Sequence, residues 1–440
     1  MTHRVDQHAA DSAGWDTNYE KKAVALLTLA FGLVGLDRWI IAPLAPAMIR
    51  DLGMTPQDMN NLIAALGVAW GVAAVLMGGL SDRIGRRAVL LPAILLFSLM
   101  SGASGMVASF SALLVVRGLM GVCEGAFCPT SFAATAEASK PSRRGFNQGL
   151  QQSAFALFGL GFGPIIATQL LERIGWKAIF MLVALPGLIL AALLWRVIRE
   201  PITVHRSAPS EKLNPVEPAP IRDLFKHRNV PLSMAGLLCA MCGIFVLSAN
   251  IPLYLTAVLH LTPVDMGIVT SALGFGGFLG QWGLPALSDH FGRRPVAIGG
   301  FAAGAALLWF FMQSGPNVPM LFTLLFASAA FSFGLLALIT GPIATEAAPI
   351  GRISTTAGII IGTGEIFGGG LALVVAGLVI TTYGIPAMLY LALGGLVVGG
   401  VLMLGLKETA PRFAGSGKFG ASALDELEER HQGSAVYREP

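Results

Sequence analysis

Charged side chains of two kinds lie within stretches of this chain that are otherwise apolar. Asp37 and Arg38 are adjacent in one such stretch, and Arg117 and Glu124 lie seven residues apart in another. A guanidinium presents a planar fork of donors to a carboxylate, and a carboxyl group can take up and release a proton. These residue types are able to bind an anionic group and to exchange a proton, so they are the first candidates for chemistry in this chain.

The spacing of Arg117 and Glu124 corresponds to two helical turns, so both side chains share one stripe of a helix at different depths. A charge at the centre of a bilayer costs about 3 kcal/mol on insertion scales, so these side chains must face a wet cavity or each other. The structural alternative is a set of buried salt bridges that hold the first and fourth helices together. A buried ion pair is often no better than packed apolar residues, which weakens this alternative.

The composition identifies the elements that must position these residues. Of the 440 residues, 54% are hydrophobic and only 12% are charged. Soluble proteins have about a quarter of their residues charged, so we predict an all-α, multi-pass membrane protein. The 54 glycines fit transmembrane helices that pack through small side chains. Apolar runs of about 20 residues predict twelve spans. They lie near residues 23–49, 58–80, 88–109, 111–136, 147–170, 177–197, 230–256, 264–286, 296–313, 319–345, 354–380 and 385–406.

Positive charge is distributed unevenly between the two ends of these spans. If both termini are cytoplasmic, the 29 Lys and Arg residues lie on the cytoplasmic side with five exceptions. The exceptions are Arg50, Arg173 and Lys177 at the outer side, and Arg38 and Arg117 within spans. This asymmetry predicts cytoplasmic termini and insertion into the inner (plasma) membrane. Because positive charge follows membrane topology, the net charge of +4 does not indicate a nucleic-acid partner.

The chain divides into two similar halves. Residues 1–20 and 409–440 are polar and are expected to be cytoplasmic tails, and residues 200–229 form a polar linker that contains several prolines. Between them we predict two six-helix bundles, at residues 21–199 and 230–408. Five small residues of the first bundle recur in the second, each shifted by 209 positions. They are Gly149, Gly159, Gly161, Gly175 and Ala178, which recur as Gly358, Gly368, Gly370, Gly384 and Ala387.

A charged loop motif also occurs twice, at residues 78–87 and 285–294. Its residues are Gly78, Asp82, Arg83, Gly85, Arg86 and Arg87 in the first copy, and Asp289, Gly292, Arg293 and Arg294 in the second. An acid, a turn glycine and an arginine pair between two apolar stretches favour a tight cytoplasmic loop. The motif resembles the loop between helices 2 and 3 of the major facilitator superfamily of transporters, and its echo between helices 8 and 9.

This resemblance implies both a fold and a role for the motif. The fold has twelve transmembrane helices in two pseudo-symmetric six-helix bundles, with a substrate cavity between them that opens to either side in turn. In that superfamily the acid, here Asp82, helps to latch the cytoplasmic side, while the arginines face the lipid headgroups. The motif residues are therefore expected to act in gating and not in substrate binding. Pro285 and His290 replace the leading Gly and the first Arg in the second copy, which implies a weaker latch there.

Further positions narrow the resemblance to the anion:cation symporter family, whose members carry sugar acids, sialic acid and other organic anions. The similar positions are Leu36-Asp37-Arg38, Arg117-Gly118-Leu119, Gly121, Glu124-Gly125, Pro129, Gly149, Ser153 and Gly175-Trp176. They cover most of the N-terminal half, and the similarity is much weaker in the C-terminal half. By this resemblance Asp37 and Glu124 take up protons, and Arg38 and Arg117 attract the substrate carboxylate.

Other residues within the predicted spans are further candidates. Trp70 is a candidate aromatic wall for the bound anion, with a helix or lipid contact as the alternative. Glu365 lies mid-span where the family pattern requires no acid, and we interpret it as an additional proton or cation site or as a ligand of a substrate hydroxyl. Asn250 is a candidate polar ligand of the substrate. Glu346 lies near the end of a span, where a charge at the level of the lipid headgroups costs little free energy, and we interpret it as structural.

We therefore predict a monomeric, proton-coupled carrier that imports a small organic anion, with the anion, protons and the lipid bilayer as its partners and no cofactor. Two other transport functions stay open. The partial pattern Gly159-x-Gly161-x-Gly163-Pro164 is typical of proton-driven efflux antiporters, and spinster-like lipid carriers share the Asp-Arg of helix 1 and the Arg-Gly and Glu of helix 4. An enzyme would need a nucleophile with a base, or a metal cluster, at membrane depth. No such constellation is seen, so no catalytic or metal site is predicted.

Overall fold

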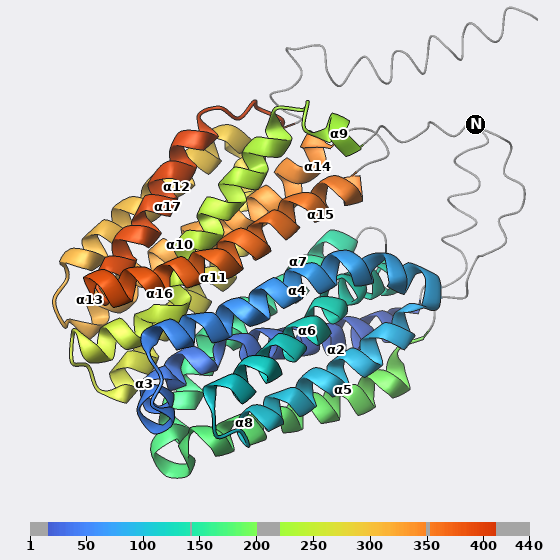
Figure 1. The fold of residues 1–440 in the computed structure, drawn as a ribbon. Helices are drawn as coiled ribbons and strands as arrows, with labels where there is room; N and C mark the ends of the chain where they lie inside the picture. Colours follow the sequence, from blue (N-terminus) through green and yellow to red (C-terminus); the bar gives the residue numbers. More distant parts are fainter. Residues whose placement is uncertain (1–15, 141–142, 200–220, 349–352, 411–440) are drawn as a thin grey trace, which may run out of the picture.

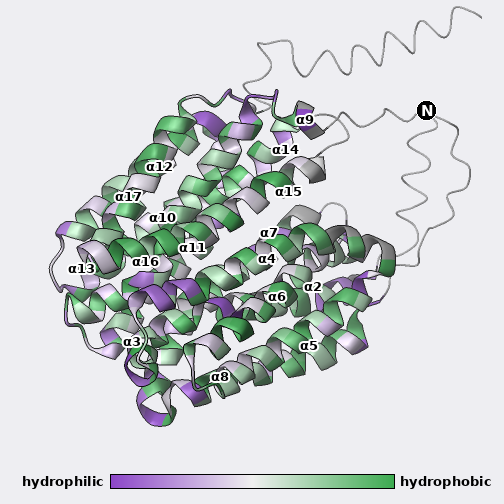
Figure 2. Cartoon of the chain, viewed as in Figure 1, coloured by the Kyte–Doolittle hydropathy of each residue, from purple (hydrophilic) through white to green (hydrophobic). Residues whose placement is uncertain are grey.

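A computed structural model describes residues 16–140, 143–199, 221–348 and 353–410. These residues form helices and short connections and contain no β-strand. The helices gather into two groups that follow the two halves of the sequence, one coloured blue to green and the other yellow-green to red in Figure 1. Figure 2 shows hydrophobic residues along the lengths of the helices and hydrophilic residues gathered mainly at their ends, as a membrane-spanning fold requires.

The helices of the N-terminal half lie between residues 17 and 197. They are α2 (Thr17–Trp39), α3 (Ile41–Leu52), α4 (Pro56–Ile84), α5 (Arg86–Ser104), α6 (Phe110–Ala138), α7 (Arg144–Ala156), the π-helical turn η2 (Leu157–Phe162) and α8 (Gly163–Val197). The first helix begins several residues before the expected span, because the Asp16 carboxylate accepts a hydrogen bond from the backbone N–H of Tyr19 and caps it.

The helices of the C-terminal half follow a short helix, α9 (Ile221–Leu224). They are α10 (Asn229–Ala257), α11 (Pro263–Phe291), α12 (Arg293–Gln313), α13 (Val318–Leu338), η3 (Ile339–Ile343), α14 (Ala344–Ala347), α15 (Ile353–Thr363), η4 (Gly364–Leu371), α16 (Ala372–Tyr383) and α17 (Ala387–Met403). Most of the predicted tails and linker lies outside the described residues, namely residues 1–15, 411–440 and 200–220.

The lengths of the described helices can be compared with the thickness of a bilayer. Nine segments of the described chain are long and apolar enough to span a bilayer. One of them, Phe146–Val197, has 52 residues, about twice the length that a bilayer needs, and it breaks at Gly175, where φ is 71°. If these two crossings are counted separately and the glycine-rich α11 and the 17-residue α17 are added, the described helices are consistent with the predicted twelve spans.

Pairs of repeated residues have the same backbone geometry in both halves. Gly85 and Gly292, the turn glycines of the loop motif, end α4 and α11 with φ of 96° and 95°, and Gly175 and Gly384 have φ of 71° and 89°. Only glycine adopts such positive φ angles without strain. The π-helical turns η2 and η4 likewise lie about 209 residues apart. The sequence repeat therefore corresponds to a structural repeat, and the prediction of two pseudo-symmetric halves is confirmed.

Glycines bring helices α4 and α6 into backbone contact. A Cβ atom added to Gly121 would overlap the backbone oxygen of Leu66, and one added to Gly125 would overlap that of Trp70. Close approach through small residues is the usual way in which membrane helices pack, because lipid provides no hydrophobic driving force between them. This packing fixes the position of Arg117 and Glu124 on α6 relative to α4.

Gly121→Ala should destabilise the folded protein, whereas Gly118→Ala should not. The new methyl group at 121 meets backbone that cannot rotate away, and overpacking of this kind typically costs about 1–3 kcal/mol. Gly118 lies on the same helix with no atom within 4 Å of the added Cβ, so alanine there should keep or slightly raise helix stability. Thermal unfolding of both variants in detergent measures the difference. Equal melting temperatures would contradict the packing described here.

The two halves touch directly at the end of the molecule that lies away from the charged loop motif. There Asn60 on α4 and Asn250 on α10 exchange two amide hydrogen bonds, of 2.8 and 3.0 Å. Nearby, the Gln57 side chain donates to the backbone oxygen of Val374 on α16 at 3.3 Å. The functional side chains lie further along these helices, where α2, α4, α10 and η4 meet.

Candidate functional site

Arg38 lies at the centre of a buried cluster to which both halves contribute. It occupies the last turn of α2, and only 1% of its surface is exposed. Its Nη2 donates to Oε2 of Glu365 on η4 at 3.0 Å. The guanidinium carbon lies 4.9 Å from the ring centroid of Phe245, 5.7 Å from that of Trp39 and 5.8 Å from that of Trp70. These are cation–π distances, so the cation is held by one acid and three aromatic rings.

Glycines on both sides allow the halves to close around this ion pair. A Cβ atom on Gly67 of α4 would lie 3.0 Å from the backbone oxygen of Gly369 and 3.3 Å from Nη2 of Arg38. A Cβ on Gly369 would lie 3.0 Å from Oε2 of Glu365. Larger residues would push α4 and η4 apart, so the absence of side chains at these positions sets the size of the space around the guanidinium.

Arg117 binds the backbone of the helix that carries Arg38. Its Nη1 donates to the carbonyl oxygen of Asp37 at 2.9 Å, and its Nη2 donates to that of Arg38 at 2.8 Å. Helix α2 ends at Trp39, and the last carbonyls of a helix have no partner within it. Arg117 is fully buried and supplies the missing donors from α6. In this conformation it positions the Asp37–Arg38 segment, and two of its three nitrogens are occupied by that task.

Arg117→Ala should lower stability as well as function. The variant leaves two buried carbonyl groups unpaired, and each unsatisfied group costs about 1–3 kcal/mol. Lys at 117 can reach one carbonyl and should restore part of the lost stability. Thermal unfolding in detergent, measured beside anion binding, checks this expectation. If Arg117→Ala unfolds at the wild-type temperature and still loses anion binding, Arg117 contacts the substrate directly.

The two predicted proton carriers lie beside these arginines with few partners. Asp37 accepts a hydrogen bond from the Ser101 hydroxyl on α5 at 2.6 Å through Oδ1, and its Oδ2 has no partner. Glu124 on α6 is fully buried, and neither of its oxygens has a hydrogen-bond partner. The two arginines and the two acids predicted from the first and fourth spans are thus brought together, and Glu365 joins them from the eleventh.

The other predicted ligands have different surroundings. Trp70 is half-buried against Arg38, and its indole N–H has no hydrogen-bond partner. Asn250 is buried, and its amide is engaged by Asn60 and by the backbone oxygen of Val246. Sequence reasoning missed Phe245 and Ser101, because a phenylalanine or a serine in a membrane helix gives no distinctive signal. Asn60 could have been found as a polar residue within an apolar span.

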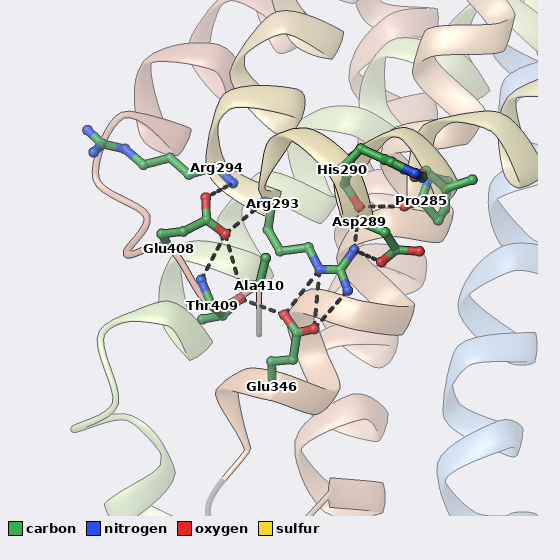
Figure 3. Close-up of polar contacts among 11 residues, drawn as sticks. Pro285, Asp289, His290, Arg293, Arg294, Glu346, Glu408, Thr409 and Ala410 are labelled. Carbon is green, nitrogen blue, oxygen red and sulfur yellow. Dashed lines mark hydrogen bonds and ion pairs between the residues drawn. The ribbon is translucent and has the colours of Figure 1, made fainter. Parts of the chain in front are cut away.

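The second copy of the charged loop motif forms a compact network (Figure 3). Arg293 is only 6% exposed; its Nε and Nη2 bind the Glu346 carboxylate at 2.9–3.2 Å. Its Nη1 donates to Oδ1 of Asp289 at 2.5 Å and to the Ser288 hydroxyl at 2.6 Å. The expectation that this arginine faces the lipid headgroups is not met, because two acids of its own half enclose it. Glu346, interpreted above as a headgroup-level charge, is its partner.

Glu408, just beyond α17, caps the start of α12 in the same network (Figure 3). Its carboxylate accepts the backbone N–H groups of Arg293 at 2.8 Å and Arg294 at 3.0 Å. Partial burial opposes its charge, but N–H donation from Ala410, Arg293, Arg294 and Thr409 holds the pKa of Glu408 below its usual range. The end of the last helix is thereby tied to the loop motif.

The first copy repeats this arrangement. Arg86 binds Glu137 at 3.0 Å and the Ser81 hydroxyl at 2.8 Å. Arg87 donates to the backbone oxygen of Trp195 at 2.6 Å, as Arg294 does to that of Leu404 at 2.9 Å. Glu137 and Glu346 are 209 residues apart, so the repeat itself could have identified both. Gly78 and the side chains of Asp82 and Arg83 lie outside the part of the chain that the structure describes.

Within the described part of the chain, no group of three or more His, Cys, Asp or Glu side chains is placed to hold a metal ion. The chemistry that the arrangement around Arg38 offers is instead that of a buried, fixed cation with aromatic walls and nearby carboxyl groups. Such a site can bind a carboxylate by charge, by fork geometry and by ring contacts.

Comparison with known proteins identifies the relatives of this chain. The sequence matches the family model of the Major Facilitator Superfamily over residues 27–360 and 234–430. It is 26% identical to the hexuronate transporter of Bacillus subtilis, over 64% of this chain and 67% of that one. It is also 26% identical to the probable 4-methylmuconolactone transporter of Cupriavidus pinatubonensis, over 80% and 82% of the two chains.

Shorter matches and solved structures add to these relatives. The 4-hydroxybenzoate transporter of Pseudomonas aeruginosa is 31% identical over 43% of this chain and 42% of its own. The crystal structure of a bacterial homologue of the human lysosomal transporter Spinster, inward-facing and unoccupied, has a TM-score of 0.68 at 18% identity, covering 88% of this chain and 95% of that one. At this identity the structural likeness establishes the fold alone.

Proposed function

Because this chain belongs to the Major Facilitator Superfamily, and is therefore a multi-pass membrane transporter and not an enzyme, we propose that it imports a small organic carboxylate together with protons by alternating access. The observation that carries the proposal is the buried guanidinium of Arg38 between aromatic rings of both halves. A fixed cation at the junction of two halves can hold an anion while the halves rock around it.

The surroundings of Arg38 favour flat or ring-shaped carboxylates. Phe245 and Trp70 offer ring faces on opposite halves, and the half-buried Trp70 has an indole N–H free to donate to a substrate oxygen. Relatives named as carriers of hexuronate, 4-hydroxybenzoate and gallate support this substrate class. Arg117 acts mainly by holding Arg38 in place. Asn250 becomes available to the substrate only when its pairing with Asn60 opens.

Proton coupling is assigned to Glu124 and Asp37. Glu124 has no donor or cation within hydrogen-bond distance, and an unpaired charge is costly at such a buried position. Asp37 has one donor, Ser101. A proton on these acids and an anion on Arg38 affect each other by charge, so the binding of one changes the affinity for the other.

The proposal includes a topology. The loop motif and both termini are cytoplasmic in the inner membrane, as the distribution of Lys and Arg supports. Residues 21–199 and 230–408 are the two rocking bundles, residues 200–229 link them, and residues 1–20 and 409–440 are tails. The arginines of the loop motif stabilise the cytoplasmic ends of their own bundles, and their gating role is part of the proposal. The transporter acts as a monomer.

The alternatives are proton-driven efflux and lipid transport of the spinster type. The structural match to the Spinster homologue supports the second only through the fold. The sequence relatives named for organic acids favour a small water-soluble anion over a lipid. Efflux would use the same site, but the substrate would leave the cell while protons enter.

An uptake screen in proteoliposomes tests this function. Radiolabelled D-glucuronate, 4-hydroxybenzoate, gallate and a lysolipid are offered with and without an imposed inward proton gradient. We expect the gradient to drive accumulation of at least one carboxylate. If an anion accumulates only when the imposed proton gradient is directed outward, the protein exchanges the anion for protons and acts in efflux. Transport of the lysolipid alone would indicate the lipid carrier.

A further inference from the structure

The Arg38–Glu365 ion pair differs from the other ion pairs of this protein in what it joins. It connects α2 of the N-terminal half with η4 of the C-terminal half. Every other ion pair between two described side chains lies within one half, such as Arg86–Glu137 and Arg293–Glu346. Halves that rock against each other must break or rearrange the Arg38–Glu365 contact.

The pair leaves part of the arginine's binding capacity unused. Nη2 of Arg38 contacts Oε2 of Glu365, while the buried Nε of Arg38 has no partner. A guanidinium can hold both oxygens of a carboxylate through two parallel N–H donors, which is stronger than a single contact. The carboxylate of Glu365 therefore pairs with Arg38 through one hydrogen bond, which is a weaker arrangement than a pair with two parallel bonds. A free carboxylate that reaches the fork of Arg38 can pair with it more completely.

We propose that Glu365 is an internal competitor of the substrate. In the empty transporter its carboxylate takes the place of the substrate carboxylate on Arg38, and the substrate binds by displacing it. The inference rests on the proposed function only in taking the displacing anion to be the transported one.

Burial of the Arg38–Glu365 pair gives a physical reason for an internal competitor. Only 1% of the Arg38 side chain and 9% of the Glu365 side chain are exposed. An arginine so enclosed without a counter-charge is strongly destabilising. Glu365 supplies that charge when no substrate is present, so the empty carrier can keep its halves together and return. Exchange of one carboxylate for another keeps the charge on Arg38 balanced throughout the cycle.

The test uses acetate, the smallest probe with the same group. Purified full-length Glu365→Ala should melt several degrees below the wild type, because Arg38 has lost its counter-ion. Sodium acetate should restore most of that loss, whereas sodium chloride at equal ionic strength and acetamide should not. The wild type should require at least about tenfold more acetate for a comparable shift, since acetate must displace Glu365. In the double variant Arg38→Ala, Glu365→Ala, acetate should have no effect.

Glu365→Gln provides a second variant of nearly unchanged volume if the alanine variant does not fold. Its neutral amide competes poorly, so half-maximal stabilisation by acetate should again need about tenfold less acetate than in the wild type. Glu346→Gln is the matched control, because it breaks a partly buried ion pair away from Arg38 and should leave the acetate response at the wild-type level.

Acetate responses of Glu365→Ala and Glu365→Gln that equal the wild type would overturn the proposal. The result is separable from the uptake screen. Rescue by acetate without uptake of any organic acid would refute the proposed function but support Glu365 as an internal competitor. Uptake of an organic acid without rescue by acetate would support the proposed function but refute the internal competitor.

Discussion

Arg38→Ala should abolish binding and uptake of the organic anion. The variant removes a buried cation that lies against aromatic rings of both halves. A hydrogen bond to a charged group contributes about 1.5–3 kcal/mol, and the fork supplies two. The affinity should therefore fall by at least about 100-fold. Equilibrium binding to the detergent-solubilised protein and uptake into proteoliposomes measure this loss.

Controls separate lost recognition from lost folding. Arg38→Ala leaves Glu365 buried without its cation, so the single variant should also be less stable. The double variant Arg38→Ala, Glu365→Ala removes both charges and should regain stability without regaining anion binding. Arg38→Lys keeps the charge but not the fork and should recover little affinity. Arg50→Ala, whose side chain is 79% exposed, is the control for loss of a surface arginine. Wild-type affinity in a folded Arg38→Ala variant would remove Arg38 from the substrate site.

Glu124→Gln should keep substrate exchange but lose accumulation driven by a proton gradient. Glutamine mimics the protonated acid, so the variant can bind the anion and change conformation, but it cannot release a proton. Substrate should therefore only equilibrate across the membrane, and the gradient-driven excess should vanish. Counterflow and gradient-driven uptake, measured in the same proteoliposomes, distinguish the two activities.

Asp37→Asn tests the second candidate acid in the same assay. Its carboxyl group is held by Ser101, so the variant should show a smaller loss if Glu124 is the principal carrier. Glu172→Gln changes an exposed acid on α8 and should behave as the wild type. Full accumulation in both Glu124→Gln and Asp37→Asn would exclude proton symport through these residues.

The membrane architecture could be predicted from local features of the sequence. Apolar runs and the repeats at 207 and 209 residues are local or periodic features, and they predicted twelve spans in two similar halves. Glycines with positive φ at Gly85 and Gly292 stand where the charged loop motif placed its turns. Charges such as Arg38, Arg117 and Glu365 stood out because a charge within an apolar stretch is rare, whatever the helix packs against.

The partners of these charges could not be predicted before the helices were placed together. Helical periodicity tells which residues share a face, but not which helix that face meets. Arg117 was expected to bind a substrate carboxylate, but its guanidinium donates to the backbone carbonyl oxygens of Asp37 and Arg38. Arg38 and Glu365 are 327 residues apart, and their pairing depends on the close approach of α4 and η4 at Gly67 and Gly369. In a membrane the contacts between helices are set by small residues and shape, and these become readable only once the helices are placed together.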